Sequence, residues 1–211
     1  MTTSSGRTRT RLSPEQRKEQ LLGYALEVFS KRGIGRAGHA DIADMAQVSV
    51  ATVFNYFSTR EELVEAVLKE AQLEFHKLIA RHLHLGKKNV RHSLSFITSA
   101  LIDAALEDKE WLKVWYEWST SIREDIWPEF VEGKNVVLDQ YTELFEHGIK
   151  EGVLPERRSA IELARLFDGI CYILYLQTHQ QPDKDALVRQ PMAILIWSVA
   201  IDPEHKKPAS E

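Results

Sequence analysis

Residues 38–57 read GHADIADMAQVSVATVFNYF, and this stretch decides the fold of the N-terminal part of the chain. The pattern predicts two short helices, over 41–46 and 50–57, joined by a tight turn at 47–49. Small residues allow the helices to cross closely, and apolar side chains supply a small shared core: Ile42, Val48, Val53, Phe54 and Phe57. This layout is typical of a helix-turn-helix that enters the major groove of DNA.

The second short helix carries the candidate base contacts. Thr52 and Asn55 are three residues apart and therefore share one face. Asparagine can bond adenine N6 and N7, and threonine or alanine can touch a thymine methyl group. The predicted base-reading residues are Ser49, Ala51, Thr52 and Asn55. The alternative is that Thr52 and Asn55 are merely exposed polar residues.

Two neighbouring residues are candidate phosphate contacts. The hydroxyl of Tyr56 could bond a phosphate, or its ring could pack at the edge of the core. His39, near the start of the first short helix, could donate to a phosphate there, or it could cap or pack.

Positive charge is concentrated at the N-terminal end. Residues 1–60 hold nine Lys and Arg against five Asp and Glu, a net charge of +4, which leaves −8 for the rest of a chain of net charge −4. A basic end on an acidic body fits a local footprint for DNA, although chance asymmetry of solvated faces would give the same count. Residues 1–12 predict a flexible arm, in which Arg9 and Arg11 could enter an A/T-rich minor groove or form only a solvated basic tail.

The composition excludes several other classes of protein. The 211 residues are 44% hydrophobic and 27% charged, which is ordinary for a globular protein, and the single cysteine cannot form an internal disulfide. No signal peptide is recognisable, and the longest apolar run is half of the ~20 residues that a membrane span needs, so a cytoplasmic, nucleoid-associated protein is expected. The histidines lack the spacing of a zinc-protease helix, and phosphate loops, GxSxG and paired cysteines are missing. We therefore expect no enzyme, metal or cofactor.

The remaining chain predicts an all-α fold in three parts: the arm 1–12, a DNA-binding domain 13–60, and a dimerisation and ligand-binding domain 61–211. Capping boxes begin helices at Ser13 and Thr59, and Gly33 ends the first of them. The second of these helices runs to about residue 85. Further helices are predicted at about 89–107, 110–122, 127–151, 159–180 and 184–200. The last two are apolar on most sides, which favours a two-fold dimer interface.

An aromatic cluster suggests either a packed core or an apolar ligand pocket. Trp111, Trp115 and Trp118 share one helical stripe, and Tyr116 lies beside them. In the pocket interpretation Gln140 is the polar anchor. The predicted pocket residues are Phe75, Leu78, Ile97, Leu101, Trp115, Trp118, Gln140 and Cys171.

Five segments resemble the TetR family of transcription regulators, and within it the LuxR/HapR/SmcR group, the master quorum-sensing regulators of vibrios. They are RTRLSPEQRK (9–18), KRGIGRAGHADIA (31–43), QVSVATVFNYFSTREELV (47–64), WLKVWYEWS (111–119) and GICY (169–172). The resemblance implies an all-helical homodimer that binds near-palindromic promoter sites and activates and represses genes according to cell density. Asp168 departs from the histidine expected in this group, which puts ligand preference or pH behaviour in question.

Two other functions fit parts of the pattern. A ligand-induced repressor of efflux or catabolic genes would share the DNA-binding module, and ligand-dependent release of DNA would identify it. The other is a helical adaptor whose basic end is incidental, and DNA binding with a steep salt dependence would exclude it.

Overall fold

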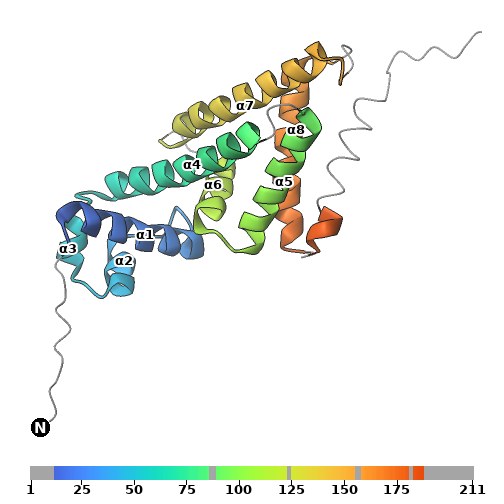
Figure 1. Ribbon diagram of the computed structural model, residues 1–211. Coiled ribbons are helices and arrows are strands. Elements are labelled where there is room, and N and C mark those ends of the chain that lie inside the picture. The colour runs from blue at the N-terminus through green and yellow to red at the C-terminus, as the bar shows by residue number, and fades with distance from the viewer. Residues whose placement is uncertain (1–11, 86–88, 123–124, 155–157, 181–182, 188–211) are drawn as a thin grey trace, which may run out of the picture. The chain divides into compact units, whose positions relative to one another are not determined.

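The computed structural model describes residues 12–85, 89–122, 125–154, 158–180 and 183–187. Every regular element within these ranges is helical (Figure 1), which confirms the predicted all-α class. The helices are α1 (Pro14–Arg32), α2 (His39–Ala46), α3 (Val50–Phe54), α4 (Arg60–Leu85), α5 (Val90–Leu106), α6 (Glu110–Thr120), α7 (Trp127–Lys150) and α8 (Ala160–Thr178). None of these helices is long and apolar enough to cross a membrane.

Both ends of α1 follow from local sequence. The N–H of Gln16 donates to Ser13 Oγ (3.2 Å), and the N–H of Ser13 donates to Gln16 Oε1 (3.0 Å), which completes the predicted capping box. Gly33 then takes φ 85°, and its N–H donates to the carbonyl of Phe29 (2.8 Å). Glycine reaches this positive φ without steric cost, so the helix ends where the sequence predicts.

The start of α4 differs from the predicted capping box in one bond. The N–H of Glu62 donates to Thr59 Oγ1 (3.1 Å), as expected. The Glu62 carboxylate, however, accepts both the N–H and the hydroxyl of Ser58, each at 2.7 Å, because these two donors lie together one residue earlier. These hydrogen bonds lower the pKa of the exposed Glu62 carboxyl below its ordinary value.

Four of the later helices agree closely with the prediction. Two of them end two residues early: α8 at Thr178 instead of 180, and α6 at Thr120 instead of 122. Ser121 caps α6 with a non-helical backbone and donates its N–H to Trp118 (3.0 Å). The predicted helix at 184–200 is seen only over 184–187, and its remainder lies outside the described residues, as do residues 1–11 of the predicted arm.

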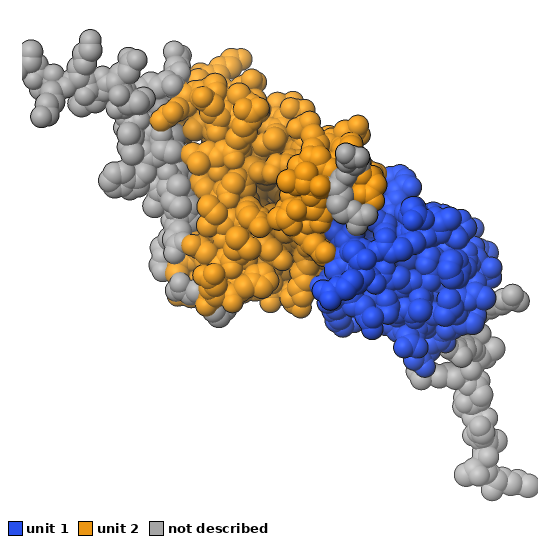
Figure 2. Space-filling model, turned by 180° about the vertical axis from the view of Figure 1, so that it is seen from behind, with its two compact units in different colours: residues 1–69 blue, residues 70–211 orange. Residues whose placement is uncertain are grey.

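The chain divides into two compact units, residues 1–69 and 70–211 (Figure 2), and the boundary between them falls inside α4. In the first unit, α2 packs against α1 and α3. Arg60, the first residue of α4, donates to the Ile34 carbonyl (2.7 Å). The core of this unit is fully buried and includes Leu21, Phe29, Ile42, Phe57 and Leu63.

In the second unit α8 packs against α5 and α7. Its largest buried side chains are aromatic: Trp118, Phe130, Tyr141, Phe145 and Phe167. The approach of α4 to α7 is close because Gly133 has no side chain. His76 Nε2 lies 2.9 Å from the Gly133 carbonyl, and a Cβ at Gly133 would stand 2.5 Å from Gln72 Oε1.

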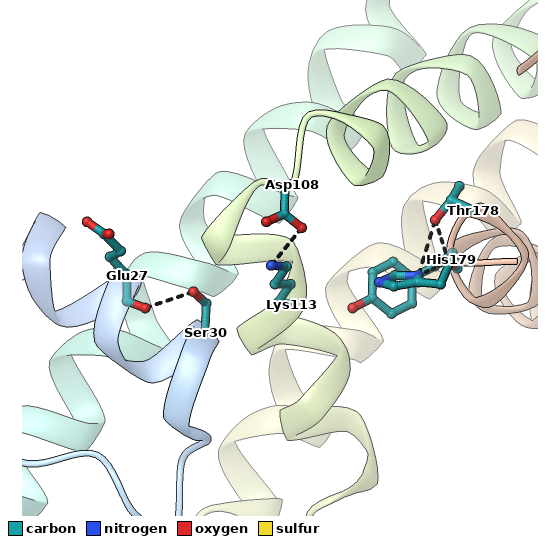
Figure 3. Close-up of polar contacts among 7 residues, drawn as sticks. Glu27, Ser30, Asp108, Lys113, Thr178 and His179 are labelled. Carbon is teal, nitrogen blue, oxygen red and sulfur yellow. Dashed lines mark hydrogen bonds and ion pairs between the residues drawn. The ribbon is translucent and has the colours of Figure 1, made fainter. Parts of the chain in front are cut away.

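Short-range contacts secure several helix ends (Figure 3). Ser30 donates to the Glu27 carbonyl in α1 (2.9 Å), and Thr178 donates to the Tyr175 carbonyl in α8 (2.7 Å). Before α6, Asp108 takes φ 60° and its carboxylate pairs with Lys113 (2.6 Å). Each contact joins residues close in sequence, so it stabilises a local element and does not build a site.

Candidate functional site

The turn between α2 and α3 is built from main-chain and side-chain caps. Gln47 ends α2 in the left-handed conformation (φ 53°), and the N–H of Val48 donates back to Ala43 (3.0 Å). Ser49 begins α3 by accepting the N–H of Thr52 at its Oγ (3.1 Å). These bonds hold the two helices at a fixed angle, as a helix-turn-helix requires.

Both helices differ in length from the prediction. α2 begins at His39, because Gly38 serves as its N-cap and donates its N–H to the Asp41 carboxylate (3.1 Å). α3 ends at Phe54 instead of 57. Asn55 caps it and donates its N–H to Ala51 (3.1 Å), and the N–H of Tyr56 then donates to Val53, only three residues back (3.0 Å). The predicted second helix is therefore too long by its final turn.

The shared core is also smaller than predicted. Ile42, Val53 and Phe57 are fully buried, as expected, and Val48 is half-buried. Phe54 is 46% exposed, so its assignment to the core is wrong. Its ring instead stacks on His39, with ring centres 4.0 Å apart.

The predicted base-reading residues lie on the outer side of α3. Ala51, Asn55 and Ser49 are exposed, and Thr52 is half-buried. Tyr56 is half-buried as well, which is compatible with a phosphate contact and with packing. The structure thus brings these residues together on one surface, and their contact with bases or phosphate stays a prediction.

His39 is held inside the unit. It is 7% exposed, and its Nε2 lies 2.7 Å from the Phe57 carbonyl, to which it donates. These contacts are those of the packing alternative. Nδ1 is the ring nitrogen of His39 that could still bond a phosphate, and this contact stays a prediction.

Several cations of the basic end are paired within the unit. Arg32 pairs with Asp41 (2.7 Å), Lys31 with Glu27 (2.6 Å), and Arg60 donates to a main-chain carbonyl (2.7 Å). These contacts restrict how the three cations can reach a phosphate backbone, and the net charge of +4 already counts Glu27 and Asp41. The contributions of Arg9 and Arg11 lie outside the described residues.

In the second unit, a partly open cavity of about 230 Å³ lies among α6, α7 and α8. Its lining consists of Trp115, Tyr116, Ser119, Thr120, Phe130, Lys134, Asp168, Gly169 and Tyr172. Trp115 is the member of the predicted pocket set that lines this cavity. A ligand site formed by Phe75, Leu78, Ile97, Leu101, Trp118, Gln140 and Cys171 stays a prediction.

Much of that predicted set forms packed core. Phe75 stacks on Trp115 with ring centres 4.5 Å apart, and Trp118 meets Phe130 edge-on at 5.4 Å. The Trp118 indole N–H donates to the Ile126 carbonyl (2.9 Å). These contacts are those expected of the packed-core alternative for the aromatic cluster.

The cavity wall carries one ion pair and one unpartnered hydroxyl. Lys134 Nζ lies 2.7 Å from Asp168 Oδ2, so Asp168, which departs from the expected histidine, faces both the cavity and a cation. The Tyr116 hydroxyl is buried and has no hydrogen-bond partner, and burial raises its pKa well above the ordinary value. Within the described ranges, no three His, Cys, Asp or Glu side chains gather as a metal site.

Comparison with known proteins now identifies the family. The sequence model of the bacterial regulatory proteins of the tetR family matches residues 21–67, from α1 to the first part of α4. The whole chain is also similar to the HTH-type transcriptional regulator LuxR of Vibrio harveyi, with 43% identity over 199 residues that cover 94% of this chain and 97% of that regulator. The chain belongs to the tetR family. This tetR-family protein is a DNA-binding transcription regulator, and the resemblance found in the sequence is confirmed.

Solved structures of similar shape support the fold alone. The fatty acid degradation regulator FadR of Bacillus halodurans superposes with a TM-score of 0.74 at 17% identity, covering 91% of this chain and 100% of that one. FadR of Bacillus subtilis in complex with stearoyl-CoA gives 0.70 at 18% identity, covering 86% and 97%.

Proposed function

We propose that this tetR-family regulator binds near-palindromic promoter sites as a homodimer and both activates and represses genes in response to cell density. The exposed outer side of α3 carries the DNA-binding part of the proposal. Two recognition helices, roughly 34 Å apart, would enter successive major grooves. The cell-density part rests on resemblance to the LuxR/HapR/SmcR group.

The homodimer is supported by exposed apolar side chains on α8. Leu166, Ile173 and Leu176 are 37%, 49% and 45% exposed, while Phe167, Ile170 and Leu174 of the same helix are buried. One apolar side of α8 is buried within its own unit, and the exposed apolar side needs another protein surface to bury it. A second copy of α8, with the segment predicted as helix at 184–200, would supply that cover in a two-fold dimer.

The proposed contacts divide by groove. Asn55, Thr52, Ala51 and Ser49 would read base edges in the major groove, and Tyr56 would bond a phosphate. Arg9 and Arg11 would enter the neighbouring minor groove. Activation would need a surface for RNA polymerase, and the protein would work in the cytoplasm at the nucleoid, without catalytic activity.

A second candidate function is control of DNA binding by a small molecule. The observation that favours it is the cavity beside Tyr116, because a buried hydroxyl without a partner gains from any acceptor or donor that a ligand brings. Aromatic walls and the Lys134–Asp168 pair would suit a largely apolar ligand with one polar end. Gln140 Oε1, the predicted polar anchor, is likewise buried without a partner.

Selection from random duplex DNA with the purified full chain tests the main proposal. A near-palindromic consensus with A/T-rich flanks, bound with a steep salt dependence, is expected. Enrichment of a single, non-repeated half-site would contradict the homodimer. If the protein retains DNA only weakly and no consensus sequence emerges, the ligand-free protein does not read DNA sequence.

A further inference from the structure

The recognition helix has an apolar edge that the base-reading residues do not explain. Val50 is 42% exposed and Phe54 is 46% exposed, while Val53 between them is fully buried. Residues four apart lie on the same side of a helix, so Val50 and Phe54 form one strip. This strip is continuous with exposed Ala51 on the outer side of α3.

The polar groups of α3 are less available than the sequence suggests. Ser49 Oγ lies 2.8 Å from Thr52 Oγ1 and also accepts the Thr52 N–H, so one of these two hydroxyls donates to the other within the helix. Asn55 is the remaining candidate base reader with a side-chain donor and acceptor, and it is exposed. Beside exposed Asn55, the accessible surface of the helix therefore carries a strip of methyl and phenyl groups.

The phenyl ring of Phe54 is held in place before any partner arrives. It lies parallel to the His39 ring, at 4.0 Å between centres and 5° between planes. His39 is itself fixed by its hydrogen bond to the Phe57 carbonyl. A ring that already packs on one face loses less conformational entropy when its outer side is covered.

We infer that Val50 and Phe54 give this regulator its sequence preference by contacting thymine C5-methyl groups in the major groove. The inference rests on the proposed entry of α3 into that groove. The thymine methyl is the one apolar group that base pairs present there, and an apolar strip on the recognition helix complements it. Cytosine offers a hydrogen-bond donor at the neighbouring edge and no methyl group, so the strip disfavours it.

Replacing thymine by deoxyuridine tests the inference, because it removes only the methyl group and leaves pairing and phosphates unchanged. In the selected operator, each thymine is replaced in turn and affinity for the full chain is measured. At one or more positions in each half-site the affinity should fall about fourfold, as expected for burial of one methyl-sized group worth about 0.8 kcal/mol.

Variants assign the effect to the side chains. Phe54→Ala and Val50→Ala should each bind the thymine operator more weakly and lose the deoxyuridine penalty at their own position. Asn55→Ala is the matched control, which should lose affinity and keep the penalty. Since Phe54 also packs on His39, Phe54→Leu and a thermal melt of each variant separate a lost contact from a disturbed fold.

The outcomes distinguish this inference from the proposed function. Specific binding that is unchanged by deoxyuridine at every position overturns the methyl contact and leaves the DNA-binding proposal standing. A penalty that persists in folded Val50→Ala and Phe54 variants overturns the assignment to these residues. Failure to select any operator overturns both.

Discussion

The Nε2 atom of His39 donates to the carbonyl oxygen of Phe57 across 2.7 Å, and so joins the first residue of α2 to the chain just beyond α3. The bond closes the helix-turn-helix from the side opposite its turn. Because the histidine is 7% exposed, water cannot replace it readily. The angle between the two helices therefore depends on a residue that the sequence suggested for DNA contact.

Replacing His39 by alanine should lower the free energy of unfolding by about 1–3 kcal/mol, since a buried carbonyl loses its donor. His39→Gln should recover part of this loss, because an amide nitrogen can occupy nearly the position of Nε2. Urea unfolding followed by circular dichroism measures both variants. Ala40→Gln, at an exposed neighbouring position, is the control, and equal stability of His39→Ala and this control would contradict the structural role.

Asn55→Ala should weaken binding to the selected operator by about 1–3 kcal/mol and abolish discrimination at one base pair. The reason is that an exposed amide on the outer side of α3 can bond both hydrogen-bonding groups of adenine. Competition titrations with single-base-pair operator variants measure the change. Asn135→Ala on the exposed surface of α7 should have no effect. The same loss of affinity for operator and scrambled DNA would refute base reading by Asn55.

The sequence allowed prediction of those features that depend on neighbours along the chain. The cap at Ser13, the stop at Gly33 and the polar outer side of α3 involve residues within four positions of one another. The bond from His39 to Phe57 spans 18 positions, and no local pattern predicts which alternative a histidine adopts. The apolar pattern predicts Phe54 in the core, yet the short α3 leaves it nearly half exposed.

In the second unit, the contacts around the cavity also join residues that are far apart in the sequence. Lys134 and Asp168 belong to different helices, α7 and α8, and their pairing depends on how these helices pack. The sequence identified Asp168 as unusual, but it gave no partner. The aromatic stripe predicted a core or a pocket, and its spacing alone could not separate the two.

Ile173→Glu should dissociate the homodimer, raising its dissociation constant by at least about tenfold. The side chain is 49% exposed on α8, so a carboxylate there would be tolerated by the single chain and would be buried only between two copies. Sedimentation at several concentrations measures the change. Ile122→Glu is the control, because Ile122 is 76% exposed and belongs to the segment after α6 instead of to α8. A dimer unaffected by Ile173→Glu would exclude this part of α8 from the interface.

Gly148→Ala should destabilise the second unit by about 1–3 kcal/mol through overpacking. A Cβ at this position in α7 would stand 2.6 Å from Val90 Cγ2 and 2.9 Å from Leu154 Cδ1, both closer than van der Waals contact. Gly23→Ala in α1 is the counterpart, since a Cβ there meets nothing within 4 Å and should add about 0.5–1 kcal/mol of stability. Thermal melts of both variants measure the difference. If Gly148→Ala melts at the same temperature as the unaltered protein, α5 and α7 do not approach this closely in solution.

The thiol of Cys171 gives a further probe of the second unit, because it is the single cysteine and is 3% exposed. Burial, aided by the negative charge of Asp168, raises the pKa of this thiol above its ordinary value. The thiolate is the reactive form, so a thiol reagent should modify the folded protein far more slowly than the urea-unfolded chain. Rapid modification of the folded protein would contradict the burial of α8.

The same raised pKa makes stability depend on alkaline pH. Above the ordinary thiol pKa the unfolded chain loses this proton while the folded protein keeps it, so the unfolding free energy falls as pH rises. The thiol contributes at most about 1.4 kcal/mol per pH unit in that range. Cys171→Ala should remove this contribution, so that the unfolding free energy falls less steeply with pH. Burial also raises the pKa values of Tyr116 and Tyr141, and the fall in unfolding free energy that they cause begins at higher pH and should remain. Urea unfolding of both proteins between about pH 8 and 10 measures the two slopes. Identical slopes would show that the thiol has the same pKa in the folded and unfolded chains.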